Sequence, residues 1–137
     1  MPDGTVLILD DDRDRVERFT AVCDGLGLAH RVWTSAYRFA EDASEHVPSA
    51  VLISLDHDLI DEKGDADVLG NGVIAAQALA ELAPSCPVIV HTTNGLAAPE
   101  MMSLLAESGW QTVRLAPIGF DWIESDWRVE AARLVSA

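Results

Sequence analysis

The sequence predicts an α/β protein in which helices cover both faces of a five-stranded parallel sheet. Short, uninterrupted apolar runs alternate along the chain with segments whose apolar residues recur every three or four positions. Strands that are apolar on both faces are typical of parallel sheets buried between two layers of helices. The 137 residues, 49% of them hydrophobic, suffice for one such domain, which we expect to span residues 1–137.

The first half of the chain carries three expected strands and two helices. The expected strands are the apolar runs Val6–Leu9 and Val51–Leu55 and the short segment His30–Trp33. The first helix presents an apolar face spaced three and four residues apart, made of Val16, Phe19, Cys23 and Leu26. Ser35 is a good N-cap for the second helix. This half therefore predicts the order strand, helix, strand, helix, strand.

The second half continues the alternation after a polar segment at residues 59–71, whose Gly64, Gly70 and Asn71 predict a loop. After this loop we expect a helix at Val73–Leu82 and a strand at Pro87–Val90. The next helix has Met101, Leu104 and Leu105 on one face and is followed by a strand at Gln111–Leu115. A final helix has Ile123, Trp127, Ala131 and Leu134 on one face. Trp122 and Trp127 lie five positions apart, so we expect one of them in the core and the other exposed.

Strict alternation of five strands and five helices restricts the topology. Crossovers between parallel strands are right-handed. For five strands, the flavodoxin-like order 2-1-3-4-5 is the common three-layer, doubly wound arrangement. The ligand crevice of such a sheet lies at the carboxyl ends of the strands, where the order switches between strands 1 and 3. The sequence therefore predicts the place of a site before any motif is considered.

The charge of the chain disfavours several partners. Nine Lys and Arg residues against 23 Asp and Glu residues give a formal net charge of −14, which disfavours a broad nucleic-acid surface or an anionic lipid surface. A small phosphate-containing ligand stays compatible with a few Arg side chains or a bound cation. No apolar run approaches the roughly 20 residues of a membrane span, and Cys23 and Cys86 form no C-x-x-C pair. We therefore expect a soluble cytoplasmic protein.

Polar side chains gather at the carboxyl ends of the strands expected at the centre of the sheet. They are Asp10-Asp11-Asp12 after the first strand, Asp56-His57-Asp58 after the third, and His91-Thr92-Thr93-Asn94 after the fourth. Converging carboxylates raise one another's pKa unless a cation compensates. We therefore expect Asp10, Asp11 and Asp56 to bind a divalent ion, Mg²⁺ in the first place and Mn²⁺ as an alternative. The competing interpretation is that such residues cap helices or line loops, with Asp12 as the N-cap of the first helix.

Two histidines, His57 and His91, each follow an apolar strand, and we expect both on the rim of the crevice. Because imidazole titrates near neutrality, one can take a proton while the other gives one, as the opening of a cyclic phosphodiester requires. Asp58 belongs to the same candidate catalytic set. The alternatives are a histidine that ligates the metal, backed by a carboxylate, and one that only bonds a backbone carbonyl. Arg13 follows the acids directly and either holds a phosphate bidentately or is a solvated first-turn arginine.

Several other phosphate and metal motifs are absent from the sequence. The acidic segments that begin at Asp56 and Asp65 lack the ligand spacing of a calcium-binding EF-hand loop. No Cys/His spacing of a zinc site occurs, and there is no P-loop, dinucleotide fingerprint or G-x-S-x-G motif. The functional hypothesis therefore depends on the polar strand ends.

The acids after the first and third strands, with Thr92 after the fourth, resemble the receiver domain of two-component response regulators over essentially the whole chain. This resemblance implies that Asp10 and Asp11 bind Mg²⁺, that Asp56 accepts a phosphoryl group, and that Thr92 contacts that group. Receivers, however, keep a Lys before the Pro that follows the fifth strand, where this chain has Ala116.

Three motifs are more similar to a divergent relative, the cyclic-phosphate processing receiver-like family, whose pattern is D-D-x-R, S-L-D-H-D-L and V-H-S/T-x-N. The chain has these motifs at residues 10–13, 54–59 and 90–94. The Pro-Val-Gly-like turn of that family is replaced here by Gly95-Leu96-Ala97. The resemblance implies a metal-assisted phosphoesterase that processes a cyclic phosphate of nucleotide or RNA-end type. In that enzyme Arg13, Thr92 and Asn94 would hold the phosphate oxygens.

Two further hypotheses stay open. A divergent receiver would accept phosphate on Asp56 and bind a protein partner through a surface that includes the last helix. A non-catalytic pseudo-receiver would act only as an interaction module. The missing Lys argues against a signalling receiver, because no cation balances the phosphoaspartate there, and the two histidines favour the enzyme.

Overall fold

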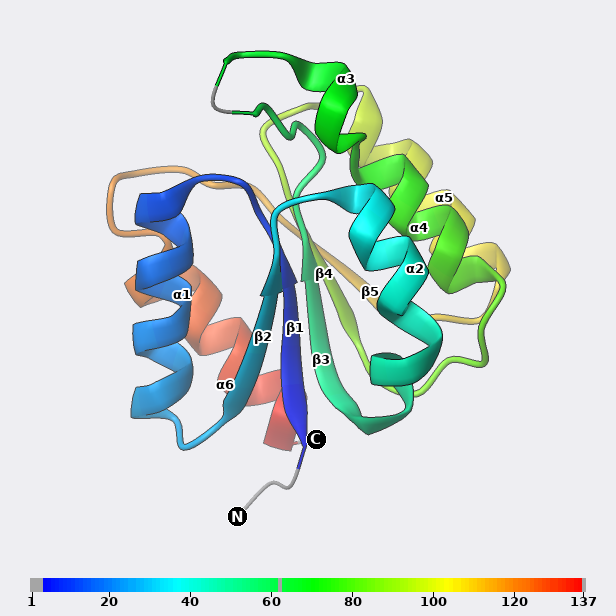
Figure 1. Ribbon diagram of the computed structural model, residues 1–137. Helices are drawn as coiled ribbons and strands as arrows, with labels where there is room; N and C mark the ends of the chain where they lie inside the picture. Colours follow the sequence, from blue (N-terminus) through cyan, green and yellow to red (C-terminus); the bar gives the residue numbers. More distant parts are fainter. Residues whose placement is uncertain (1–3, 62, 137) are drawn as a thin grey trace.

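The sheet has the predicted topology. The computed structural model describes residues 4–61 and 63–136. Five parallel strands lie in the order β2-β1-β3-β4-β5 (Figure 1). Their bounds are β1 Thr5–Leu9, β2 Ala29–Trp33, β3 Ala50–Leu55, β4 Val88–His91 and β5 Thr112–Leu115. Leu9 pairs with Leu55, so β1 and β3 end level with each other on either side of the switch point.

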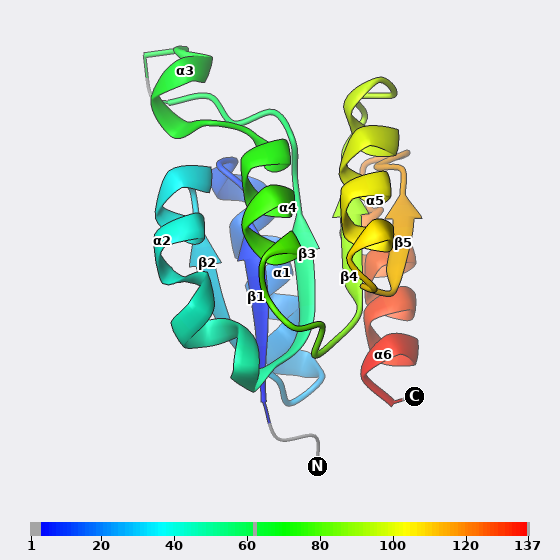
Figure 2. The same ribbon diagram turned by 90° about the vertical axis from the view of Figure 1, so that its right-hand side faces the viewer.

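Helices cover both faces of this sheet. Their bounds are α1 Arg13–Gly25, α2 Ala36–His46, α4 Gly72–Ala80, α5 Ala97–Glu107 and α6 Arg128–Ser136, with a 3-10 turn, η1, at Val47–Ser49. Helices α2, α4 and α5 pack on one face, and α1 and α6 pack on the other (Figure 2). The three layers are those expected from the alternating pattern. Among the described residues, no helix is both long and apolar enough to cross a membrane.

The pleat of the strands decides which polar residues meet at the carboxyl edge. Every second strand residue packs toward α1 and α6, as do Val6, Ile8, Leu52 and Ile89. Two residues further along the same rows lie Asp10, Ser54 and His91, and Asp56 follows Ser54 after two more. One face of the sheet therefore carries all four of these polar side chains to its carboxyl edge.

Capping side chains fix where the helices beside this edge begin. Asp12 Oδ1 accepts the backbone N–H of Arg15 at 2.9 Å, and Ser35 caps α2 as predicted. Asn71 Oδ1 accepts the N–H of Val73 at 2.9 Å at the start of α4. Asp12 thus takes the capping role that was the alternative to metal binding, and it places Arg15 in the first turn of α1.

Both tryptophans of the last segment are buried, so the expectation that one of them is exposed is wrong. Trp122 is 5% exposed and Trp127 is 0% exposed. The cause is a π-helical turn, η2 (Ile123–Trp127), in which the N–H of Trp127 donates to the oxygen of Trp122 at 2.8 Å. Because this turn bonds residues five apart, side chains five apart share a face. An exposed tryptophan therefore no longer supports a partner surface on the last helix.

The polar segment at residues 59–71 is not entirely loop. It contains a four-residue helix, α3 (Ala66–Leu69), which begins at the capping side chain of Asp65. The segment leaves and rejoins the sheet edge at one point, where Asp58 and Asn71 form an antiparallel bridge. Figure 1 shows α3 beyond the carboxyl ends of the strands, on the edge of the sheet where the candidate site lies.

Candidate active site

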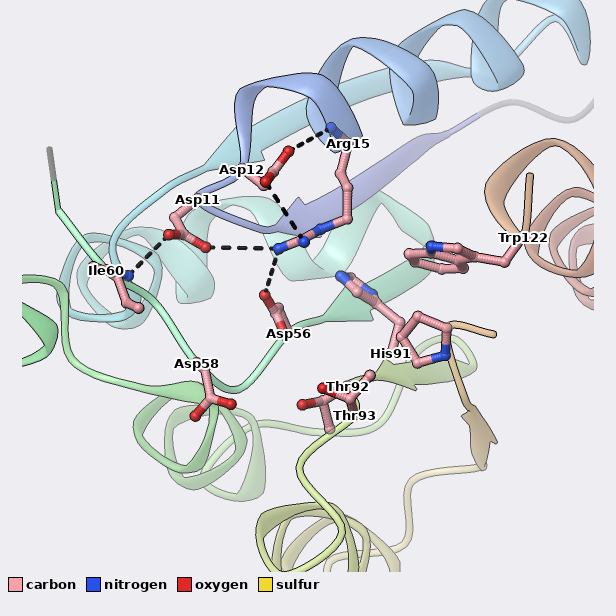
Figure 3. A pocket seen from close by; sticks show the side chains of 11 residues that line it. Asp11, Asp12, Arg15, Asp56, Asp58, Ile60, His91, Thr92, Thr93 and Trp122 are labelled. Atoms are coloured by element: carbon pink, nitrogen blue, oxygen red, sulfur yellow. Dashed lines mark hydrogen bonds and ion pairs between the residues drawn. The ribbon is translucent and has the colours of Figure 1, made fainter. Parts of the chain in front are cut away.

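A pocket of about 430 Å³ opens at the carboxyl edge of the sheet, at the switch point (Figure 3). It is lined by Asp11, Asp12, Arg15, Asp56, Asp58, Ile60, His91, Thr92, Thr93, Pro117 and Trp122. The polar residues come from the ends of β1, β3 and β4 and the start of α1. Ile60, Pro117 and Trp122 add an apolar part to the wall. The pocket therefore lies where the sequence placed the crevice.

Arg15 is the central cation of this pocket. Its Nε donates to Asp10 Oδ2 at 2.9 Å and its Nη2 to Asp10 Oδ1 at 2.8 Å, which makes a bidentate fork. Nη2 also donates to Asp56 Oδ2 at 3.2 Å. Carboxylate oxygens of Asp11 and Asp12 lie 3.8 and 3.7 Å from guanidinium nitrogens. One guanidinium therefore faces four carboxylates, as Figure 3 shows in part.

The two buried carboxylates respond to this setting in opposite directions. Asp10 is 0% exposed and Asp56 is 6% exposed. Burial alone raises the pKa of Asp10, but hydrogen bonds with His91 and Arg15 outweigh it and hold the pKa below its usual range. For Asp56 burial dominates and raises the pKa to about 6, with the charge of Asp10 adding to the effect. Asp10 therefore stays ionised at neutral pH, whereas Asp56 changes charge just below neutrality.

His91 belongs to a buried chain of hydrogen bonds that ends on Asp10. Trp127 Nε1–H donates to Ser54 Oγ at 3.0 Å, and Ser54 Oγ lies 2.7 Å from His91 Nδ1. His91 Nε2 lies 3.0 Å from Asp10 Oδ2. An indole only donates and an ionised carboxylate only accepts. With a neutral imidazole the chain therefore has one direction, in which Ser54 donates to Nδ1 and Nε2–H donates to Asp10.

The expectation that His91 lies on the rim is wrong. It is 1% exposed, and its ring centroid lies 5.0 Å from that of Phe19 and 5.9 Å from that of Trp122. Strand β4 does not end at Val90 but runs through His91, which pairs with Leu115 of β5. The imidazole is therefore held between the sheet and its covering helices, with both nitrogens engaged.

His57, Asp58 and Asn94 form a separate group beside the pocket. His57 Nδ1 lies 2.7 Å from Asp58 Oδ1, and Asn94 Nδ2 donates to the same oxygen at 3.3 Å. Since the carboxylate accepts the Nδ1 proton, Nε2 of the neutral ring is left as the basic nitrogen. Asp58 lines the pocket, whereas His57 is not among the lining residues. The backbone N–H of His57 donates to Asp56 Oδ1 at 2.8 Å, which ties the two groups together.

The residues that best fit a divalent ion differ from the expected set in one member. Asp10, Asp56 and His91 each offer a ligand atom, and these atoms lie within 4.8 Å of one another. Asp11 instead uses its Oδ2 to accept the N–H of Ile60 at 2.9 Å. Carboxylates suit Mg²⁺, and two carboxylates with an imidazole also suit Mn²⁺. The donor set therefore fits a divalent cation, at the same carboxylates that Arg15 contacts.

The three expected phosphate ligands lie in different places. The side chain of Arg13 is 93% exposed and its Nε lies 3.6 Å from Glu17, away from the pocket. Thr92 lines the pocket, and its Oγ1 accepts the N–H of Asn94 at 3.1 Å. Asn94 Oδ1 accepts N–H groups at the start of α5. The arginine that reaches the pocket is Arg15, two residues after Arg13.

Two site residues received no role from the sequence: Arg15, which lies outside the three motifs, and Ser54, which is the first residue of the motif at residues 54–59. Arg15 lies four residues before Phe19 and seven before Val22, both buried, so it stands on the face of α1 that meets the sheet. Ser54 lies two residues before Asp56 and therefore shares its face of β3. The signal for the position of each side chain is the periodicity of its helix or strand.

Comparison with protein families gives one match. The family model described as Cyclic-phosphate processing Receiver domain matches residues 5–107. This span holds β1 to α5, and with them every strand-end residue of the pocket. No curated protein matches the chain significantly.

Solved structures of receiver domains share the fold. The CheY-like response regulator receiver domain protein from Methanospirillum hungatei JF-1 matches with a TM-score of 0.67 and 16% identity over 97% of this chain and 96% of that one. The response regulator domain of Thermotoga maritima CheB gives 0.68 and 14% over 98% of each chain. The CheX–CheY–BeF3–Mg²⁺ complex from Borrelia burgdorferi gives 0.65 and 15% over 95% of this chain and 89% of that one. Asp10, Asp56 and His91 thus form a buried cluster at the active-site position of receivers.

Proposed function

We propose, from the premise that this chain belongs to the cyclic-phosphate processing receiver domain family, that its pocket opens a small cyclic phosphate by hydrolysis. The observation that carries the proposal is the cluster that Arg15 forms with the buried carboxylates of Asp10 and Asp56 at a pocket of about 430 Å³. That volume suits a ligand of nucleotide size. The net charge of −14 disfavours a longer polyanion. We place this activity in the cytoplasm, where the free thiols of Cys23 and Cys86 stay reduced.

Asp10 and Asp56, with His91 behind them, are the residues that would hold a divalent ion, Mg²⁺ or Mn²⁺. The likeness to the Borrelia burgdorferi complex, which contains Mg²⁺, supports this assignment. When bound, the ion would supply positive charge to the phosphate oxygens. His91 orients Asp10 through its Nε2, and Ser54 fixes the imidazole from the other side.

His57 and Asp58 supply the proton transfer in this proposal. Hydrolysis consumes one water, forms one P–O bond and breaks the P–O bond to a ribose oxygen. Asp58, which lines the pocket, holds the Nδ1 proton of His57. Once the ring turns its Nε2 toward the pocket, that nitrogen takes a proton from the attacking water and returns it to the leaving oxygen. Thr92, which borders the pocket, and Asn94, which binds Asp58, lie on the same side. Arg13 would reach the phosphate only by leaving Glu17, so Arg15 is the better phosphate ligand.

Turnover of cyclic phosphates tests the proposal. The full chain is incubated with 2′,3′-cyclic nucleotides in Mg²⁺, in Mn²⁺ and in EDTA, and release of the phosphomonoester is followed by chromatography. We expect metal-dependent opening that Asp56→Asn abolishes. Absence of turnover on every cyclic phosphate would overturn the enzyme assignment and favour an interaction module.

A second candidate is a signalling receiver, which the position of Asp56 at the end of β3 beside Thr92 favours. A BeF3-activated DrrB receiver domain has the same fold, with a TM-score of 0.68 at 14% identity over 98% of this chain and 99% of that one. In this function a partner would bind a surface that includes α6. Because Ala116 stands where receivers keep a Lys, we expect acetyl phosphate to leave no long-lived phosphoryl group on Asp56. Stable, near-stoichiometric labelling in mass spectrometry would reverse the order of the two candidates.

A further inference from the structure

We infer that Arg15 is an internal cation that competes with a divalent ion for the same carboxylate oxygens, so that the ion binds only when the guanidinium turns away. The inference rests on the metal site of the proposed function. It assigns to Arg15 a role in setting how tightly that site binds metal.

The acceptor sites of Asp10 are fully used. Its Oδ1 accepts the N–H of Asp12 at 2.9 Å and Nη2 of Arg15 at 2.8 Å. Its Oδ2 accepts Nε of Arg15 at 2.9 Å and lies 3.0 Å from Nε2 of His91. A carboxylate offers about four lone-pair sites. A metal ion can therefore reach Asp10 only by displacing one of these donors.

Arg15 is the donor that can leave at least cost. The partners at Asp12 and His91 are fixed, one by the backbone at the start of α1 and the other by burial in the core. The Arg15 side chain is 31% exposed and borders the pocket. Its Nη1 already lies 3.7 Å from Asp12, which can keep the charge paired after it turns. Departure of Arg15 frees a site on each Asp10 oxygen and one on Asp56 Oδ2.

Charge makes the two cations mutually exclusive. A divalent ion bound to Asp10 and Asp56 would lie within a few ångströms of the guanidinium in its present place, where like charges repel strongly in a partly buried site. The same guanidinium compensates Asp10, which is wholly buried. Arg15 therefore already supplies a positive charge to these carboxylates, and a metal ion must compete with it.

Metal affinity of a matched pair of variants tests this competition. Arg15→Gln removes the competing guanidinium. Arg13→Gln removes the same charge two residues away, from a side chain that is 93% exposed and pairs with Glu17. Binding of Mn²⁺ to the wild type and both variants is measured from the loss of the free-ion signal in electron paramagnetic resonance. We expect Arg15→Gln to bind Mn²⁺ at least about tenfold more tightly than Arg13→Gln.

A measurement on the wild type guards against an Arg15→Gln chain that fails to fold. The arginine Nε–H resonances are followed by NMR during titration with Mg²⁺, with Arg18 as the internal reference because its Nε donates to Glu124 outside the site. We expect the Arg15 signal to shift and lose its protection from exchange with water as Mg²⁺ saturates, while the Arg18 signal stays in place.

The outcomes separate this inference from the proposed function. Equal, saturable Mn²⁺ binding by the two variants, with an unmoved Arg15 signal, overturns the competition and leaves the metal site standing. Absence of binding in all three proteins overturns both. Binding that appears only in Arg15→Gln supports the competition and removes the metal from the proposed function of the wild type.

Discussion

The hydroxyl of Ser54 holds His91 from behind, so its removal isolates the effect of the buried hydrogen-bond chain. We expect Ser54→Ala to lower the free energy of unfolding by about 1–3 kcal/mol, because it leaves Trp127 Nε1–H and His91 Nδ1 buried without partners. Urea denaturation measures this change. The control is Ser49→Ala, whose exposed Oγ donates to the oxygen of His46; we expect it to stay within about 0.5 kcal/mol of the wild type. An equal loss of unfolding free energy in both variants would show that the buried hydrogen bonds of Ser54 add no stability.

Asp56 gives the stability of the protein a pH dependence with a definite sign. The pKa of Asp56 is about 6 in the folded state and about 3.9 in an unfolded chain. Between these values the folded state holds a proton that the unfolded state has released, so the free energy of unfolding falls as pH rises from about 4 to 6. We expect Asp56→Asn, in EDTA, to gain on the order of 2 kcal/mol relative to the wild type across this window.

Asp10 is the matched control, because its pKa is lowered rather than raised. Its ionised form stabilises the folded state above the unfolded pKa, and that stabilisation is lost as pH falls. Asp10→Asn should therefore be less stable than the wild type at neutral pH and approach it in acid. The unfolding free energies of Asp56→Asn and the wild type are compared by urea denaturation at each pH. A difference between them that does not change with pH would contradict this account of the cluster.

At the scale of elements, Gly72 sets how closely α4 approaches the end of β3. A Cβ at this position would overlap the backbone oxygen of Asp56 and lie 2.6 Å from Met101 Cε and 2.8 Å from the Cα of His57. We expect Gly72→Ala to cost about 1–3 kcal/mol or more, because backbone atoms cannot move aside cheaply. The same substitution at Gly25, where a Cβ would meet nothing within 4 Å, should leave the thermal midpoint nearly unchanged. If Gly72→Ala and Gly25→Ala had the same thermal midpoint, the segment after β3 would have space for a Cβ at residue 72.

The elements were predictable where one periodicity governs a whole segment. All five strands overlap the ranges predicted for them, and α2 begins after its predicted cap at Ser35. One of Trp122 and Trp127 was wrongly expected to be exposed, because the expectation used an α-helical period where one π-helical turn occurs. The helix α3 lies in a polar segment whose four helical residues are too few to show a period. Short segments with irregular hydrogen bonding thus could not be predicted from the sequence pattern.

At the scale of the whole molecule, topology placed the site more reliably than motifs assigned its roles. The switch point brought Asp10, Asp56 and Thr92 together as predicted. Which arginine faces them depends on the rotation of α1 against the sheet, and this is set by packing across the core. The burial of His91 depends on Trp122 and Trp127, which lie more than thirty residues further along the chain. The roles of residues that depend on such distant contacts can be assigned only from the structure.

The rate of cyclic phosphate opening in a pair of histidine variants tests the central claim most directly. His57→Ala removes the proposed proton-transfer group. His30→Ala removes a histidine of β2 whose Nε2 lies 3.2 Å from Asp24 Oδ1 and which does not line the pocket. With 2′,3′-cyclic nucleotides as substrate and circular dichroism as the folding control, we expect His57→Ala to lose roughly 10²–10⁴-fold in turnover and His30→Ala to keep the wild-type rate. A folded His57→Ala that turns over at the wild-type rate would contradict the account.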